Sequence, residues 1–196
     1  MDGITVAIPS IPPRGNLLSR AVASVAQQTM PASAISIAVD LGKQGAPPTR
    51  QRALDAVTTP YVAFLDDDDE FLPTHLEDLY NHMRDTGADI VYSWFKVVAR
   101  GGHVLEDDPV FPPGHYLDEF DPENPIETTV TTLVRTELAK EIGFRALDRG
   151  HGANTGEDFG FILGAVKAGA KIRHLVKKTW LWHHDSGNTS GRPDRW

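Results

Sequence analysis

The sequence predicts an α/β fold in which helices flank a sheet with parallel strands. The first observation behind this prediction is the order strand, helix, strand near the N-terminus, which is the unit that builds parallel sheets. The second is the uninterrupted apolar run Tyr61–Leu65, which is typical of a central strand buried on both faces. With 196 residues, the chain is long enough to bury a core without disulfides and fits a single domain.

The first half of the chain alternates strands and helices. Ile4–Ile8 is expected to form a strand that Pro9 ends, and Ile35–Val39 a second strand. Between them, apolar residues spaced i, i+3, i+4 and i+7 from Leu18 predict a helix that ends before Pro31. The elements expected next are a loop over 42–48, a helix over 49–57, the central strand over 61–65, a helix after 74 and a strand over 88–98.

The second half begins with residues 101–125, which are rich in Pro, Gly and acids. Their weak periodicity predicts a long surface excursion with room for one β-ribbon. The elements expected after it are a strand over 128–134, a helix over 136–142, a loop over 143–156, a helix closed by Gly169, and two strands over 171–176 and 179–182.

The composition excludes several classes of protein. The chain has no cysteine, which rules out thiol catalysis, Cys-ligated zinc and iron–sulfur clusters and favours a cytosolic setting. No stretch of about 18 apolar residues is present to span a bilayer, and we expect no signal peptide. The net charge of −8 argues against binding to a nucleic-acid backbone. The fingerprints of dinucleotide enzymes, P-loop proteins, zincins and α/β-hydrolases are also missing.

Four aspartates and a glutamate, residues 66–70, follow the predicted central strand directly. Like charges this close raise one another's pKa unless a cation offsets them. The C-terminal ends of parallel strands are also where α/β sheets place ligands. Carboxylate oxygens at this edge suit Mg²⁺ or Mn²⁺ shared with a phosphate-bearing substrate. The structural alternative is a solvated acidic turn that caps the following helix.

Glu157 and Asp158 open another predicted helix, near the positive end of its dipole, where ionised carboxylates are favoured. An ionised Asp at this position can accept a proton from a hydroxyl group. The same segment fits a capping box, with Thr155 as N-cap and Asp158 at the third helical position. Capping and catalysis are therefore both open for this pair.

Three basic side chains are further candidates. His183 and His184 follow the last predicted strand and could present an imidazole to a metal or a pyrophosphate, although a surface position is the alternative. Arg50 could pair with the acidic run or with a diphosphate, and its alternative is an ordinary surface arginine.

Taken together, these segments resemble a family 2 glycosyltransferase of the GT-A fold. The likeness covers nearly the whole chain, from Ile4 to about Thr189, and the motifs stand in the family's order and spacing. The motifs are Val6-Ala7-Ile8-Pro9-Ser10, Ala38-Val39-Asp40, Thr49-Arg50-Gln51-Arg52-Ala53, the D-x-D-containing Tyr61–Asp69, and Gly156-Glu157-Asp158-Phe159. The chain departs from the family where Thr49, Gln51 and Ala53 replace Ala, Asn and Gly.

The resemblance implies a Rossmann-like GT-A domain spanning residues 1–196, with a mixed, mostly parallel sheet flanked by helices. Residues 1–100 would form the half that binds the nucleotide sugar, and residues 101–196 the acceptor and catalytic half with a C-terminal tail. The implied activity is metal-dependent transfer of a sugar, with inversion, from a nucleotide-diphosphate sugar to an acceptor hydroxyl. Uridine is the default base, and acceptor contacts are expected in 101–125 and in the tail from Gly187.

The resemblance also implies roles for individual residues. Asp158 would be the catalytic base, with Glu157 beside it as a second catalytic residue. Asp68 and Asp66 would hold Mn²⁺ or Mg²⁺, together with His184 or His183, between which the sequence does not decide. The residues implied to bind the nucleotide sugar are Pro9, Asp40, Arg50, Asp66 and Asp67.

Two other functions stay open. One is a catalytically degenerate module that binds sugar nucleotides without turning them over. The other is a nucleotidyltransferase, which would need a Gly-rich phosphate loop near the N-terminus, and the segment Ser10–Gly15 is a poor version of one.

Overall fold

The computed structural model of the chain describes residues 3–99, 101–105, 120–123, 125, 131–145 and 156–184. In this part of the chain, eight strands form one sheet in the order β2-β1-β3-β7-β5-β8-β4, with β6 paired to β5. The strands are β1 (Ile4–Ser10), β2 (Ala34–Val39), β3 (Tyr61–Phe64), β4 (Glu70–Phe71), β5 (Ile90–Ala99), β6 (Val104–Leu105), β7 (Thr132–Arg135) and β8 (Ile172–His184). The helices are the 3-10 turn η1 (Pro12–Arg14), α1 (Gly15–Ala26), α2 (Ala46–Asp55), α3 (His75–Thr86), α4 (Thr136–Ile142) and α5 (Glu157–Lys167).

The sheet is mixed, and five of its strands point the same way. Strands β2, β1 and β3 pair in parallel, as do β5 and β8. Strand β7 runs antiparallel between β3 and β5, which leaves those two strands parallel to each other. Strands β4 and β6 are antiparallel to β8 and β5. The predicted α/β fold with a mixed, mostly parallel sheet is therefore confirmed.

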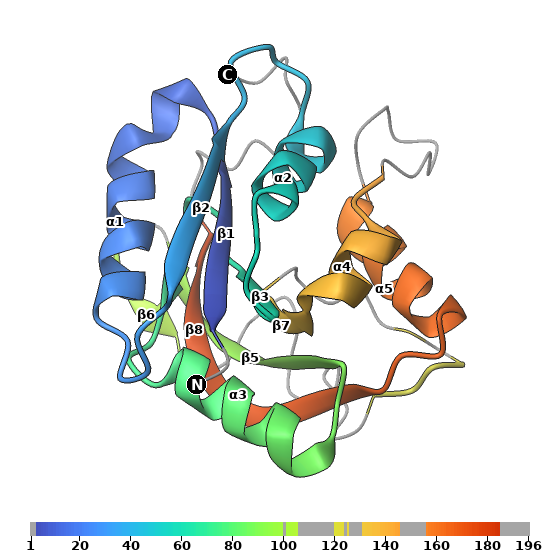
Figure 1. Cartoon of the computed structure of the whole chain (residues 1–196). Coiled ribbons are helices and arrows are strands. Elements are labelled where there is room, and N and C mark those ends of the chain that lie inside the picture. Colours follow the sequence, from blue (N-terminus) through green and yellow to red (C-terminus); the bar gives the residue numbers. More distant parts are fainter. Residues whose placement is uncertain are drawn as a thin grey trace.

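Helices cover both faces of this sheet (Figure 1). Helices α1 and α3 pack on one face against side chains that include Val6 and Leu65. Helices α2, α4 and α5 pack on the other face against side chains that include Ala7 and Phe64. Because successive side chains of a strand point to opposite faces, β1 and β3 contribute to both cores. The expectation that the run after Pro60 is a strand buried on both faces is confirmed.

Two predicted boundaries were wrong at prolines. Strand β1 does not end at Pro9, since Pro9 and Ser10 stay in register with Ala38 and Val39, and the Asp40 amide donates to the Ser10 carbonyl at 2.8 Å. Helix α2 begins at Ala46 instead of Thr49, so two prolines predicted to lie in a loop occupy its first turn. A first-turn proline needs no N–H donor and has a helical φ, which explains why the helix tolerates both.

The two strands predicted over 171–176 and 179–182 are one strand, β8. Its pairing with β5 continues throughout, with register shifts on either side of Trp94. A bulge of this kind absorbs extra residues without ending a strand, and the sequence around Lys177 had suggested a break. The short strand β4, which pairs with β8 at Leu181 and Trp180, was not predicted. A β-ribbon is present, but only β6 lies in the expected range 101–125, because its partner is the end of β5, where Val97 pairs with Leu105.

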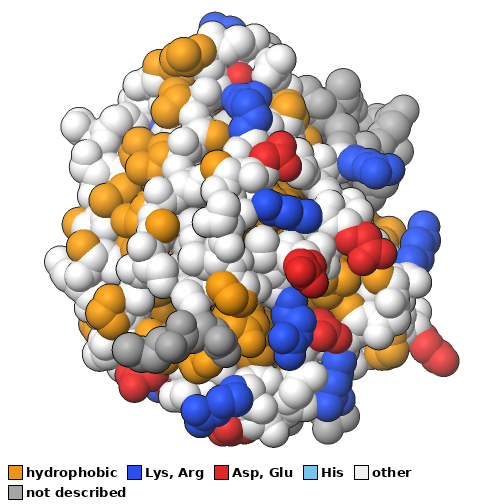
Figure 2. Space-filling view, viewed as in Figure 1, with side chains coloured by type: hydrophobic (Ala, Val, Ile, Leu, Met, Phe, Trp, Pro, Cys, Tyr) orange, Lys and Arg blue, Asp and Glu red, His pale blue; other side chains and the backbone are white. Residues whose placement is uncertain are grey.

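The surface of the molecule is uneven in character. Figure 2 shows apolar side chains spread over the side of α1 and β2, and charged side chains of both signs towards α2, α4 and α5. Strand β2 lies at the edge of the sheet and keeps Ile35, Ile37 and Val39 exposed. Within the described ranges, no helix has both the length and the apolar character needed to cross a membrane.

Candidate active site

The acidic run forms a turn at the C-terminal end of β3. Leu65 still donates its amide to the Ala7 carbonyl at 3.2 Å, and the Asp69 amide returns to the Asp66 carbonyl at 3.2 Å. Asp67, Asp68 and Asp69 are buried, whereas the Asp66 side chain keeps 42% of its surface exposed. Buried carboxylates are costly unless charged or hydrogen-bonding partners compensate them, so the partners of this turn are informative.

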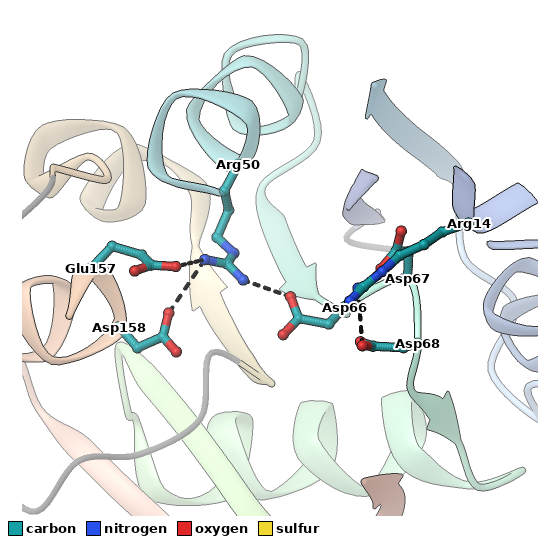
Figure 3. A network of polar contacts seen from close by, with 7 residues as sticks. All are labelled: Arg14, Arg50, Asp66, Asp67, Asp68, Glu157 and Asp158. Atoms are coloured by element: carbon teal, nitrogen blue, oxygen red, sulfur yellow. Dashed lines mark hydrogen bonds and ion pairs between the residues drawn. The ribbon is translucent and has the colours of Figure 1, made fainter. Parts of the chain in front are cut away.

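Three arginines from three different elements supply that compensation, and Figure 3 shows two of them, Arg14 and Arg50. Arg14 of η1 places Nη1 2.7 Å from Asp67 Oδ1 and 2.9 Å from Asp68 Oδ2. Arg20 of α1 donates from Nη2 to the Asp68 carbonyl at 2.6 Å and places Nε 3.2 Å from a Glu70 carboxylate oxygen. Arg50 of α2 places Nη2 2.5 Å from Asp66 Oδ1. The sequence had singled out Arg50 but neither of the other two.

Arg50 also reaches the first turn of α5. Its Nη1 lies 2.8 Å from Glu157 Oε1 and 3.3 Å from Asp158 Oδ1, so one guanidinium joins carboxylates from two distant parts of the chain (Figure 3). Burial acts to lower the pKa of Arg50, but the carboxylates of Asp66, Asp158 and Glu157 outweigh it and raise that pKa. The centroid of the Phe144 ring lies 5.5 Å from the guanidinium carbon of Arg50. Of the two roles open for Arg50, the structure shows the pairing with the acidic residues.

The start of α5 differs from the predicted capping box. The N-cap is Gly156, in the left-handed region at φ +78°, and no side chain caps the helix. A positive φ favours glycine, which explains the residue found there. Thr155 lies outside the described residues. Asp158 is thus the second helical residue, and its carboxylate points to Arg50 instead of capping the backbone.

The two carboxylates of α5 differ in access. The Glu157 side chain is 11% exposed and that of Asp158 is 37% exposed. Burial of the Asp158 carboxyl group raises its pKa, and the negative charges of Glu157 and Asp66 add to this, while Arg50 opposes it. A carboxylate with a raised pKa is a stronger base. Of the two carboxylates, Asp158 is therefore the one that combines a raised pKa with an exposed side chain.

Three of the aspartates converge. Asp66, Asp68 and Asp69 each offer one carboxylate oxygen, and these three oxygens lie within 4.8 Å of one another. Burial and the charge of Asp66 raise the pKa of Asp68 to about 7 against the effect of Arg14. Burial and the charge of Asp68 likewise raise the pKa of Asp69 well above its usual value. A set of oxygen donors that repel one another fits a hard divalent cation such as Mg²⁺ or Mn²⁺.

Asp67 lies outside this cluster. Asp69 belongs to it, although the sequence analysis did not name Asp69 as a metal ligand. Asp67 Oδ2 accepts a hydrogen bond from Ser10 Oγ at 2.7 Å, and its other oxygen holds Arg14. Asp69 Oδ1 accepts the His183 amide at 2.9 Å. Asp69 reaches the cluster because the chain reverses direction at this turn. A run of consecutive acidic residues carries no local pattern that predicts this reversal.

The structure does not decide which of His183 and His184 would contact a metal ion. His183 Nε2 lies 2.7 Å from a Glu70 carboxylate oxygen at the rim of the cluster. His184 is the last residue of β8, and its side chain lies outside the described part of the chain. Metal binding by either histidine therefore remains a prediction.

The predicted nucleotide contacts lie at the ends of β1 and β2. Pro9 is buried in β1. Asp40 is fully buried, and its two oxygens accept the amides of Gln44 at 2.9 Å and of Gly45 at 2.7 Å. In this structure Asp40 shapes the loop that leads into α2, and its contact with a base stays a prediction. Most of the expected acceptor region, 106–119, and the tail from Gly187 lie outside the described residues.

A mixed α/β sheet with a carboxylate cluster at its strand ends is the arrangement of a GT-A glycosyltransferase. The model of the family "Glycosyl transferase family 2" matches residues 35–143, which is more than half of the chain. The chain therefore belongs to glycosyl transferase family 2. No curated protein matches the sequence.

Solved structures with a similar fold include TarS of S. aureus. The crystal structure of TarS 1–349 in complex with UDP-GlcNAc superposes with a TM-score of 0.73 at 19% identity, covering 98% of this chain and 60% of that one. The complex of TarS 1–349 with UDP gives a TM-score of 0.71 at 19% identity over 92% of this chain and 60% of that chain. The chain thus spans 60% of the length of these two TarS chains, and the likeness confirms the GT-A fold.

Proposed function

We propose that this chain transfers a sugar from a nucleotide-diphosphate sugar to an acceptor hydroxyl, with inversion at the anomeric carbon. The observation that carries the proposal is the Arg50 bridge, in which one guanidinium contacts Asp66 on one side and Glu157 and Asp158 on the other. The proposed reaction needs carboxylates that hold a metal ion beside the donor and a carboxylate that takes a proton from the acceptor. Arg50 contacts one proposed metal ligand, Asp66, and the proposed base, Asp158.

The donor that we propose is UDP-linked. Support comes from family membership and from TarS, whose crystal structures include complexes with UDP-GlcNAc and UDP. Pro9, Asp40, Arg50, Asp66 and Asp67 remain the proposed neighbours of the nucleotide sugar, because they lie at or beside the C-terminal ends of β1, β2 and β3, where α/β sheets bind ligands. A cytosolic setting, supported by the lack of cysteine, belongs to the same proposal.

Asp66, Asp68 and Asp69 are the residues that would hold Mg²⁺ or Mn²⁺. The fit rests on their oxygen donors, which lie within 4.8 Å of one another, and on the raised pKa values of Asp68 and Asp69, which a nearby divalent cation would lower again. Bound there, such an ion would offset the charge of the diphosphate and make it a better leaving group.

Asp158 is the proposed base. The acceptor hydroxyl gives its proton to the Asp158 carboxylate, and the acceptor oxygen forms a bond to the anomeric carbon. The bond from that carbon to the diphosphate oxygen breaks at the same time, and the nucleotide diphosphate leaves with the electron pair. Glu157, which is less exposed and bound to Arg50, acts in this scheme by positioning Arg50.

The test is calorimetric titration with UDP, GDP and their common sugar conjugates, with and without Mn²⁺. We expect one nucleotide to bind in a metal-dependent way and this binding to be lost in Asp68→Ala. Asp85→Ala is the matched control, since Asp85 is an exposed aspartate on α3 that pairs only with its neighbour Arg84 among the described residues. If no nucleotide diphosphate binds to the folded protein, the proposed function is wrong.

A further inference from the structure

Arg14 contacts the acidic turn at the point where we propose a metal ion. Its Nη1 lies between two carboxylates, 2.7 Å from Asp67 Oδ1 and 2.9 Å from Asp68 Oδ2 (Figure 3). The Arg14 side chain is 12% exposed, so this contact is only weakly screened by water. A positive charge this close to a ligand oxygen opposes a divalent cation on the same oxygen.

The contacts of Arg14 with the carboxylates of Asp67 and Asp68 are not equivalent. Asp67 is a fixed anchor, because its other oxygen accepts a hydrogen bond from Ser10 at the end of β1 and because it lies outside the cluster of converging oxygens. Asp68 is a member of that cluster. A cation entering the cluster would therefore compete with Arg14 for Asp68 and leave the contact with Asp67 in place.

Arg20 and Arg50 contact the acidic turn in other ways than Arg14 does. Arg20 contacts Asp68 through the backbone carbonyl and not through the carboxylate. Arg50 contacts Asp66, which also belongs to the cluster, but two further carboxylates hold its side chain, which is only 4% exposed. Of the three arginines on the turn, Arg14 is thus the one that shares a single nitrogen, Nη1, between a cluster carboxylate and a carboxylate outside the cluster, whereas Arg50 uses a separate nitrogen for Asp66.

We propose that Arg14 is an internal counter-ion of Asp68, which a divalent cation displaces, and that Arg14 then stays on Asp67 and donates to the diphosphate of the donor. This inference rests on the proposed function, because it takes the acidic cluster as the metal site. It makes Arg14 a positioning residue in the metal-free protein and a binding residue in the donor complex.

The inference predicts opposite effects of one substitution. Arg14→Gln removes the charge that competes with the metal, so metal binding in the absence of nucleotide should become tighter. The same change removes a donor to the diphosphate, so UDP binding in the presence of metal should become weaker. A purely structural role of Arg14 would weaken both.

The first measurement is Mn²⁺ binding without nucleotide, followed by electron paramagnetic resonance of the free ion. We expect the Mn²⁺ dissociation constant of Arg14→Gln to fall roughly ten-fold below that of the wild type. Arg14→Lys keeps the charge and should stay near the wild type, and Arg84→Gln controls for loss of a positive charge at an exposed site of α3. Calorimetry with UDP at saturating Mn²⁺ should then show roughly ten-fold weaker binding for Arg14→Gln.

The outcomes separate this inference from the proposed function. If the wild type binds Mn²⁺ and UDP but Arg14→Gln binds Mn²⁺ no more tightly, the role of Arg14 is wrong and the proposed function stands. If neither protein binds Mn²⁺, with or without UDP, both are wrong.

A measurement on the wild type keeps the inference testable if Arg14→Gln does not fold. The ¹⁵N side-chain resonances of the arginines are followed by NMR during titration with Mg²⁺. We expect the Arg14 resonance to shift as its contact with Asp68 is exchanged, and by more than that of Arg20. An unchanged Arg14 resonance at saturating Mg²⁺ would overturn the inference.

Discussion

The acidic turn after β3 and the first turn of α5 both place carboxylates on Arg50, but the two regions present them differently. In the turn, Asp67 and Asp68 are buried and paired with Arg14. In α5, Glu157 is buried and contacts Arg50, while Asp158 keeps more than a third of its side chain exposed. Adjacent acids therefore differ in chemistry because their partners differ, and the partners come from elsewhere in the chain.

The largest expected effect concerns the exposed member of the α5 pair. Asp158→Asn removes the proposed base, and we expect turnover of the donor to fall about a thousand-fold, since general bases contribute rate factors of that order. The affinity for UDP should stay within about three-fold of the wild type. Release of UDP from UDP-GlcNAc, or from whichever conjugate binds in the calorimetric test, provides the rate.

Glu157→Gln is the comparison for this prediction. Because Glu157 contacts Arg50 from a buried position, its loss should disturb Arg50 and affect donor affinity more than Asp158→Asn does. Unchanged turnover in Asp158→Asn would reject Asp158 as the base and remove the distinction between the two carboxylates.

The pairing of the two regions shows what the sequence could and could not predict. Strands such as β3 and helices such as α4 follow from local periodicity, and their predictions are confirmed. The Arg14 and Arg20 contacts cross 48 to 54 positions of the chain, and no local pattern encodes such distances. The N-cap at Gly156 depends on a left-handed φ, which a Thr-x-x-Asp pattern does not reveal.

The second prediction concerns pH and the acidic turn. The pKa of Asp68 in the folded chain is about 7, above the ordinary value of 3.8, so between these values the folded state binds more protons than the unfolded state. The contribution of Asp68 to stability is therefore present at low pH and is lost as the pH rises towards 7. A divalent cation should offset this loss, because it replaces the proton at the carboxylate.

The measurement is the melting temperature with and without Mg²⁺ at two pH values. We expect Mg²⁺ to raise Tm by a few degrees at pH 7.5 and by much less at about pH 5, where protons compete for Asp68. Asp68→Ala should lose the dependence on Mg²⁺, and Asp85→Ala should keep it. An equal Mg²⁺ effect at both pH values would show that the carboxylates of the turn do not bind the ion.

The smallest expected effect tests Asp67, the member of the turn that faces away from the cluster. Ser10→Ala removes the hydroxyl that donates to Asp67 Oδ2 at 2.7 Å, and the loss of one hydrogen bond to a buried charged group should cost about 1.5 kcal/mol of unfolding free energy. Urea denaturation measures that loss. Mn²⁺ affinity without nucleotide should change little, because Ser10 contacts none of the three converging aspartates among its described hydrogen bonds. If Ser10→Ala changed Mn²⁺ affinity as strongly as Asp68→Ala, Asp67 would belong to the metal site. The distinction between Asp67, which anchors Arg14, and the proposed metal ligands Asp66, Asp68 and Asp69 would then be wrong.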